Sequence, residues 1–160
     1  MTLDEAFRGT NRLLEWEDGR KIEAKIPRGV KTGSRVRLKG KGTPGISGGE
    51  PGDLYLAIEV LPDTRFQRDG DDLTTTLSVD LFHLLLGGKV MVAGIDRRVN
   101  LDIPPETQNG KIFRLRGLGM PKLKQPEQRG DLYVTVDALL PQRFSEQERS
   151  LIQQWQTMRR

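Results

Sequence analysis

The sequence has no cysteine and only one histidine, His83, among its 160 residues. A disulfide framework, a thiolate zinc site and a cysteine nucleophile are therefore excluded, and so is a site with several histidine ligands. No apolar run of about eighteen residues could span a bilayer, and the opening MTLDEAFRGT lacks the basic head and apolar core of a signal peptide. We expect no metal, no cofactor, no membrane association and a cytoplasmic location.

The sequence also lacks a large excess of charge of either sign, because 26 basic and 22 acidic residues give a net charge of only +4. One segment is locally basic, with six cations and no acid: Arg28, Lys31, Arg35, Arg37, Lys39 and Lys41. Strand alternation would place Arg35, Arg37 and Lys39 on one solvated face. Contact with acidic polypeptide segments is the second interpretation. Nucleic acid is not the expected partner, since the segment has no aromatic residue for stacking.

Three short motifs do not make a catalytic or ligand site. RLKGKGTPG, residues 37–45, is rich in glycine and lysine but is followed by TPGISGGEPGD, which cannot form the helix that a phosphate-binding loop needs. DGDD, residues 69–72, lacks the glycine and spacing of a calcium loop and is interpreted as an acidic hinge. His83 has no evident nucleophile or acid as a partner. We expect a glycine-dependent turn at the first motif and no enzymatic activity.

An internal repeat organises the chain. The segment from Lys21, KIEAKIPRGVKTGSRVRLKGKGTPG, aligns with RVNLDIPPETQNGKIFRLRGLGMPK from Arg98 at a constant offset of 77 residues. Further along, the offset increases by one residue, and GDLYLAIEV from Gly52 aligns with GDLYVTVDA from Gly130. Each copy is near the lower size limit for an independent core. The expected organisation is a domain over 1–66, a second over 67–140 and a terminal segment over 141–160.

Within each copy, apolar residues recur at every second position, as in LYLAIEV. This alternation indicates half-buried strands. Short runs separated by Gly, Pro and Asn favour antiparallel hairpins. The predicted fold is mainly β, with two tandem antiparallel sandwich-like domains of related fold. Each has one short helix, in TLDEAFRG with Thr2 and Glu5 as a capping box and Gly9 as the stop, and in DLFHLLLGG with Gly87 as the stop.

The tail from residue 141 predicts a longer amphipathic helix. Ser145 and Glu148 fit another capping box, and apolar residues follow on one face at helical spacing: Leu151, Ile152, Trp155 and Met158. We expect this apolar helix face to pack against another protein surface. Leu14 and Trp16, in NRLLEWEDG, share one side of a short strand and are either core residues or part of an exposed apolar groove.

Seven segments in the same order resemble the C-terminal substrate-binding region of the DnaJ co-chaperones: TLDEAFRGT, KIPRGVKTGSRVRLKGKG, GDLYLAIEV, FQRDGDDL, LLLGGKV, LDIPPETQNG and RGDLYV. The resemblance covers nearly the whole chain. It implies two tandem β-domains that dimerise through the C-terminal helix and bind unfolded clients. The family's peptide groove matches Leu14, Trp16 and Phe66, and the acidic tail of a DnaK-type partner would meet Arg12, Arg20 and Lys21.

The chain also departs from the family pattern. No J-domain with its His-Pro-Asp signature is present, so the resemblance implies no stimulation of ATP hydrolysis, and EWEDGRK stands where some members insert a cysteine-rich zinc module. Family members carry a further strand before TLDEAF, whereas this sequence starts at Met1. The sequence is compatible with an excised fragment of a longer co-chaperone and with a natural chain that has no J-domain. The rival interpretations are a basic nucleic-acid-binding module and a dimerisation scaffold without a client site.

Overall fold

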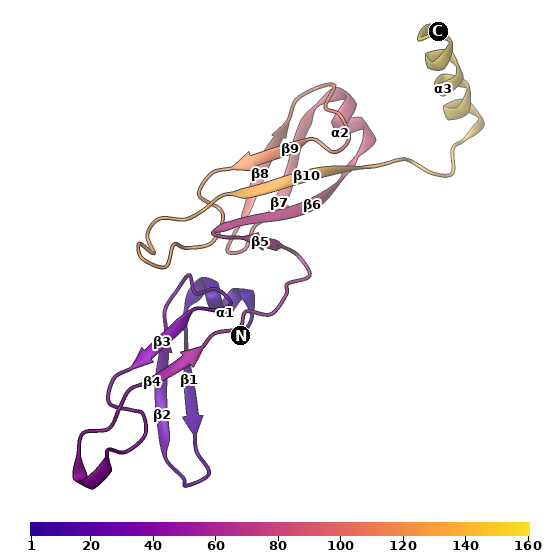
Figure 1. Ribbon diagram of the computed structural model, residues 1–160. Coiled ribbons are helices and arrows are strands. Elements are labelled where there is room, and N and C mark those ends of the chain that lie inside the picture. Colours follow the sequence, from indigo (N-terminus) through magenta and orange to yellow (C-terminus); the bar gives the residue numbers. More distant parts are fainter. The chain divides into compact units, whose positions relative to one another are not determined.

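The computed structural model describes all 160 residues and is built mainly of short strands (Figure 1). The elements in chain order are α1 (Leu3–Arg8), β1 (Thr10–Glu15), β2 (Lys21–Ile26), β3 (Arg35–Leu38), the 3-10 helix η1 (Ile46–Gly48), β4 (Leu54–Ala57), β5 (Gln67–Asp69), β6 (Asp72–Asp80), α2 (Leu81–Leu86), β7 (Gly88–Ala93), β8 (Arg98–Ile103), β9 (Ile112–Leu115), β10 (Leu132–Leu139) and α3 (Glu146–Met158). The predicted mainly β class is confirmed.

The residues group by contact into two compact units. Unit 1 comprises Met1–Thr75, Gly94–Arg97 and Phe113–Val134, and unit 2 comprises Thr76–Ala93, Arg98–Ile112 and Thr135–Arg160. Strands β6, β9 and β10 have residues in both units. The domain boundaries expected from the repeat, 1–66, 67–140 and 141–160, stay predictions.

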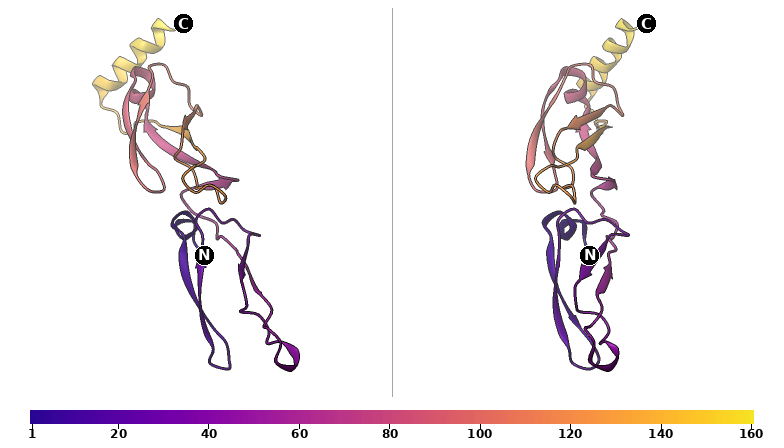
Figure 2. Two further views of the ribbon diagram at one scale, coloured as in Figure 1. Left: turned by 90° about the vertical axis from the view of Figure 1, so that its left-hand side faces the viewer. Right: turned by 60° about the vertical axis from the view of Figure 1, so that its left-hand side comes forward.

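Two antiparallel hairpins form the first part of unit 1. Strand β1 pairs with β2 so that Thr10 lies opposite Ile26, and β3 pairs with β4 so that Leu38 lies opposite Leu54. Figure 2 shows the two hairpins as facing layers. The predicted alternation in β4 and beyond is confirmed, because Leu54 and Leu56 are half-buried and Ile58 is buried, whereas every second residue is exposed. Each hairpin therefore turns one apolar side toward the other.

The helix boundaries follow the predicted caps. The Thr2 hydroxyl accepts a hydrogen bond from the Glu5 amide at 3.1 Å, and the Glu5 carboxylate accepts one from the Thr2 amide at 2.8 Å. Helix α1 ends at Gly9, with φ of 76°, and α2 ends at Gly87, with φ of 82°. The Ser145–Glu148 capping box is likewise present at the start of α3. These local signals were sufficient to place all three helices.

RLKGKGTPG forms a turn after β3, as predicted. Gly40 has a φ of 69°, a conformation that favours glycine. Its amide donates to Asp53 Oδ1 at 2.9 Å, while Arg37 Nε donates to Asp53 Oδ2 at 2.7 Å. The second repeat has the same arrangement of Gly117, Arg114 and Asp131. One aspartate in each repeat thus holds the turn and the preceding strand together.

Both aspartates should make folding sensitive to acid. The turn amide, and then the arginine, hold the pKa of Asp53 and of Asp131 below the ordinary value of 3.8. A lowered folded-state pKa contributes stability that is complete above the unfolded pKa and is lost as pH falls through the folded pKa. We expect Asp53→Asn and Asp131→Asn to be less stable than wild type at pH 7. The difference should shrink below about pH 4, as measured by urea unfolding at several pH values. A constant difference down to pH 2 would contradict this origin.

A four-stranded sheet in the order β5-β6-β10-β9 forms the second repeat's counterpart of the β3–β4 hairpin. The Leu73 amide in β6 donates to the Asp131 carbonyl at 2.9 Å, and the Asp131 amide donates to Asp72 Oδ1 at 2.7 Å. The DGDD segment, interpreted as a hinge, is instead a hairpin turn, because Asp69 pairs directly with Asp72 between β5 and β6. A two-residue loop with Gly70 in the left-handed region makes this connection tight.

Unit 2 contains the antiparallel β7–β8 hairpin and helices α2 and α3. Its buried residues include Val79, Leu84 and Val92. Helix α3 differs from α1 and α2, because every one of its residues is exposed. No helix of the chain is long and apolar enough to cross a membrane.

Candidate polypeptide-binding groove

A groove of about 350 Å³ opens between the two hairpins of the first repeat. Strand β1 contributes Arg12 and Leu14, and the segment from β4 onward contributes Leu56 and Ile58. The full lining is Met1, Arg12, Leu14, Ile26, Leu56, Ala57, Ile58 and Glu59. Leu14 and Leu56 are half-buried, while Ile26 and Ile58 form the buried floor. The groove is therefore apolar inside, with the side chains of Arg12 and Glu59 at its rim.

Trp16 lies on the same face of the hairpin as Leu14 but outside the groove lining. Its amide donates to the Arg20 carbonyl at 2.9 Å across the β1–β2 turn, and the Arg20 guanidinium lies 5.3 Å from the centre of its ring. The side chain is half-buried. Leu14 and Trp16 thus form a continuous apolar strip along β1, with the cationic group stacked at its end.

Strand β1 pairs with β2 alone, so its other edge is unpaired. Hydrogen-bonding direction alternates along a strand. Because Trp16 bonds toward β2, Leu14 and Arg12 do the same, and the backbone groups of Asn11, Leu13 and Glu15 face the unpaired edge. An extended segment can add to such an edge through its own backbone. The edge runs directly beside the strip of Leu14 and Trp16.

The three cations predicted to receive an acidic tail lie on the β1–β2 hairpin, and each has an acidic neighbour. Arg12 contacts Glu5 at 2.8 Å, Arg20 contacts Asp18 at 2.7 Å, and Lys21 lies 3.9 Å from Glu15. The backbone amide of Thr2, with Arg12 adding to it, lowers the pKa of Glu5. All three pairs are exposed and therefore weak. A carboxylate from a ligand can compete for these cations.

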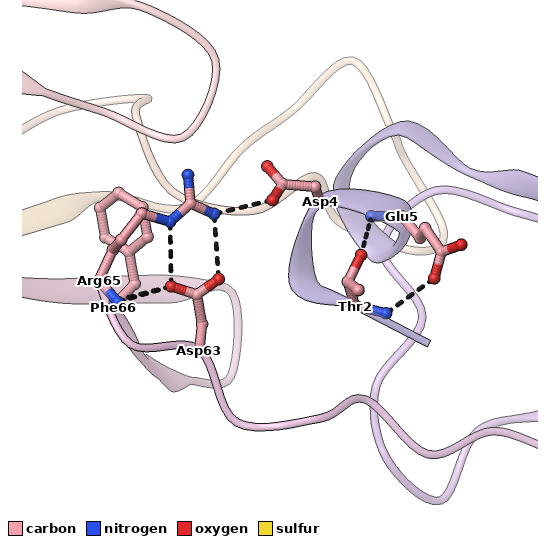
Figure 3. A network of polar contacts seen from close by, with 6 residues as sticks. All are labelled: Thr2, Asp4, Glu5, Asp63, Arg65 and Phe66. Atoms are coloured by element: carbon pink, nitrogen blue, oxygen red, sulfur yellow. Dashed lines mark hydrogen bonds and ion pairs between the residues drawn. The ribbon is translucent and has the colours of Figure 1, made fainter.

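Phe66 lies in another cavity, of about 580 Å³, together with Leu3, Pro62 and Arg68. Its ring is 5% exposed and stacks under the Arg65 guanidinium, 5.1 Å from the ring centre. Figure 3 shows Arg65 held between Asp63 and Asp4, next to the capped start of α1. Arg65 in turn lowers the pKa of Asp63. The structure does not bring Phe66 into the groove of Leu14, and its predicted peptide contact stays a prediction.

The residues predicted to form a dimer lie on one exposed face of α3. Ile152 and Trp155 line a cavity of about 1140 Å³ within unit 2 together with Phe82 and Leu86 of α2. Leu151 and Met158 lie outside that lining and are 58% and 81% exposed. Apolar side chains from both helices are therefore open to solvent in this region.

The basic face of β3 is exposed, as predicted for Arg35, Arg37 and Lys39. Arg37 is already bonded to Asp53. Arg37 on this face therefore helps to stabilise the turn after β3.

Sequence reasoning missed several groove residues, namely Met1, Ile26, Leu56 and Ile58. The alternation in LYLAIEV places Leu56 and Ile58 on an inward face. It does not show which inward residues remain open to solvent, because that depends on the strand pairing.

Taken together, the chain is a repeated β protein in which two-stranded sheets enclose an apolar groove beside an unpaired edge. Residues 1–141 match the family model described as DnaJ C terminal domain, and the chain belongs to this family.

Curated relatives with the name "Chaperone protein DnaJ" are similar over most of the chain. The protein from Bartonella quintana is 39% identical over 151 residues, which are 94% of this chain and 39% of the relative. That from Nitratidesulfovibrio vulgaris is 42% identical over 136 residues, which are 85% of this chain and 36% of the relative. The chain thus spans about two fifths of the length of these relatives. The cytoplasmic location stays a prediction.

Proposed function

We propose that the chain is the client-binding part of a co-chaperone and holds extended, apolar segments of non-native polypeptides. The observation that supports this function best is the apolar strip of Leu14 and Trp16 beside the unpaired edge of β1. A client supplies backbone hydrogen bonds to Asn11, Leu13 and Glu15 and places alternate side chains against Leu14. Backbone bonds do not depend on side-chain identity, so binding is weak and tolerant of sequence.

The same edge receives the acidic tail of a DnaK-type chaperone. Arg12 lies in the groove lining, and Arg20 and Lys21 follow at the end of the hairpin. Because their present ion pairs are exposed and therefore weak, tail carboxylates replace Glu5, Asp18 and Glu15 at low cost. A tail and a client therefore compete for one strand edge.

Two copies of the chain pair through α3 to form a clamp. Support comes from the exposed apolar face of α3 with Leu151, Ile152, Trp155 and Met158. Burial of that face against a second copy removes apolar surface from water. Two weak client sites in one dimer bind a single long client more tightly than either site alone.

Loss of client holding is the expected result of the double substitution Leu14→Ser, Trp16→Ser. Two half-buried apolar contacts are removed, each with about 1–3 kcal/mol of hydrophobic contribution when fully covered by a client. The measurement is suppression of aggregation of a chemically denatured client by wild type and variant at equal concentration.

The matched control is Ile46→Ser, since Ile46 is an apolar residue of η1 that is 94% exposed and lies outside the groove lining. It should hold client as wild type does. If the double variant also holds client as well as wild type, the chain acts as a dimerisation scaffold only. If holding instead falls steeply with salt and requires Arg35, Arg37 and Lys39, a charged nucleic-acid-type interaction replaces the proposal.

A further inference from the structure

The outward face of the β3–β4 hairpin brings cations and an aromatic ring together. Arg35 and Arg37 are exposed and alternate along β3 with half-buried residues, and Lys39 follows at the next outward position. In the register of the hairpin, Arg37 lies opposite Tyr55 and Arg35 lies opposite Ala57. Residues that are directly opposite or diagonal on one face of a strand pair are neighbours. Tyr55 is therefore next to Arg37 and within reach of Arg35.

Tyr55 supplies the aromatic residue that the basic segment itself lacks. No aromatic side chain occurs within residues 28–41, and for that reason the sequence does not predict a nucleic-acid partner. The pairing of β3 with β4 places Tyr55 on the same face as the cations. It is 56% exposed, more than any other aromatic residue of the chain. The face thus combines a ring on which bases can stack with cations that phosphates can contact.

Two of the cations on this face are free of carboxylate partners. Arg37 Nε donates to Asp53 Oδ2 at 2.7 Å, and the second repeat retains this pair, so it belongs to the turn. Arg35 and Lys39 are exposed and form no ion pair within the chain. Their charges are available to an anionic ligand without the loss of an existing contact.

The second repeat shows that the hairpin can form without this combination of residues. Lys39 has a basic counterpart in Arg116. Arg35, in contrast, is replaced by Ile112, which is 56% exposed. Tyr133 takes the place of the tyrosine of β4 and is half-buried. The first repeat therefore has both the more basic face and the more open ring.

We infer that this face of the first repeat, formed by Arg35, Lys39 and Tyr55, binds single-stranded nucleic acid. A base stacks on the ring of Tyr55, and neighbouring phosphates contact Arg35 and Lys39. This function goes beyond the binding of polypeptides. It does not use the groove, because these side chains lie on the side of the hairpin opposite to its apolar side. Arg37 stays bonded to Asp53 and holds the turn.

The exposed ring favours an unpaired strand over a duplex and over an acidic polypeptide. In a duplex the faces of the bases are stacked on one another, so only the phosphates would meet the cations. An acidic polypeptide offers carboxylates to the cations but has no bases to stack. Every base has a π-face, so stacking on Tyr55 is tolerant of sequence. Because only two cations are free, binding is weak and salt-dependent.

The probe is a fluorescently labelled oligothymidylate of about ten nucleotides, a length within the usual range of single-strand sites. Its anisotropy is measured with the intact chain over a series of salt concentrations. Tyr55→Ala should weaken binding about tenfold, because base–aromatic stacking is lost, whereas Tyr55→Phe retains the ring and should bind as wild type does. Arg35→Gln with Lys39→Gln should weaken binding and flatten the slope of log affinity against log salt by about 1.4, which is ~0.7 for each phosphate contact.

The matched control for charge is Lys89→Gln with Arg98→Gln. It removes the same charge from exposed positions of the β7–β8 hairpin, and it should leave both the affinity and the salt slope unchanged. An unlabelled duplex of the same length and a polyglutamate peptide serve as competitors. Both should displace the probe about tenfold less well than unlabelled oligothymidylate does.

The inference is overturned if the oligonucleotide does not bind, if Tyr55→Ala binds it as wild type does, or if the charge control weakens binding as much as the variant of the basic face. Equal competition by polyglutamate would assign the face to acidic polypeptides, and equal competition by the duplex would exclude stacking. The proposed function is tested separately. Every variant of this face should hold client as wild type does, and Leu14→Ser, Trp16→Ser should still bind the oligonucleotide.

Discussion

Truncation after Pro141 should convert the proposed dimer into a monomer, as measured by light scattering on a sizing column. The removed segment includes all of α3, whose residues are exposed throughout. Leu151, Ile152 and Trp155 are each more than two fifths exposed, and a contiguous exposed apolar face of this kind is typical of a protein–protein contact. The strands end at Leu139, before the cut, so the β-structure should remain folded.

Point variants test whether dimerisation depends on the apolar face of α3 and not only on the presence of the helix. Ile152→Ser with Trp155→Ser should dissociate the dimer, because both side chains lie on the apolar face. Gln153→Ser with Gln154→Ser changes neighbouring residues of the same helix outside the predicted apolar set and should leave the dimer intact. A truncated chain that still elutes as a dimer would place the interface elsewhere.

Gly130→Ala should destabilise the chain by about 3 kcal/mol, at the upper end of the cost of overpacking. The new Cβ would lie 2.2 Å from the Asp71 carbonyl oxygen, which is backbone and cannot rotate away. Either the β6–β10 pairing or the turn before β10 must shift. Urea unfolding of the variant and wild type measures the difference.

The repeat provides the matched control at Gly52. A Cβ atom there would contact nothing within 4 Å, so Gly52→Ala should change stability by about 0.5 kcal/mol or less. Neither glycine has a positive φ, so backbone strain does not enter the comparison. Equal losses at both positions would show that the close approach of the Asp71 carbonyl at Gly130 is not the cause of the destabilisation.

Local chemistry explains why much of the fold was predictable. Thr2 with Glu5, and Ser145 with Glu148, form their caps from residues three apart. The turn at Gly40 could be identified because Gly117 repeats it with different neighbours. The DGDD segment was misinterpreted as a hinge because its polar composition suits a linker and a hairpin turn equally well.

The candidate site was predictable only in part, since it depends on contacts between distant segments. Alternation within β1 placed Leu14 and Trp16 on one side, and the structure agrees. Whether Leu14 is open to solvent depends on its neighbours across the groove, and its counterpart Val92 is buried despite a similar local pattern. Phe66 was grouped with Leu14 by resemblance, yet it lines a different cavity. The spacing of residues within one strand does not predict which distant segments lie next to them in the folded chain.

The bond between Asp131 and Asp72 spans 59 positions of the chain, and this distance has a kinetic consequence. The hairpins β1–β2 and β7–β8 close over short loops and β3–β4 over a longer one that contains η1, but β6 meets β10 only after a still longer segment has been ordered. Loop closure over that length has a larger entropic cost, and contacts of high sequence separation slow folding. The first repeat should therefore reach its native hairpins early, while the four-stranded sheet forms in the rate-limiting step.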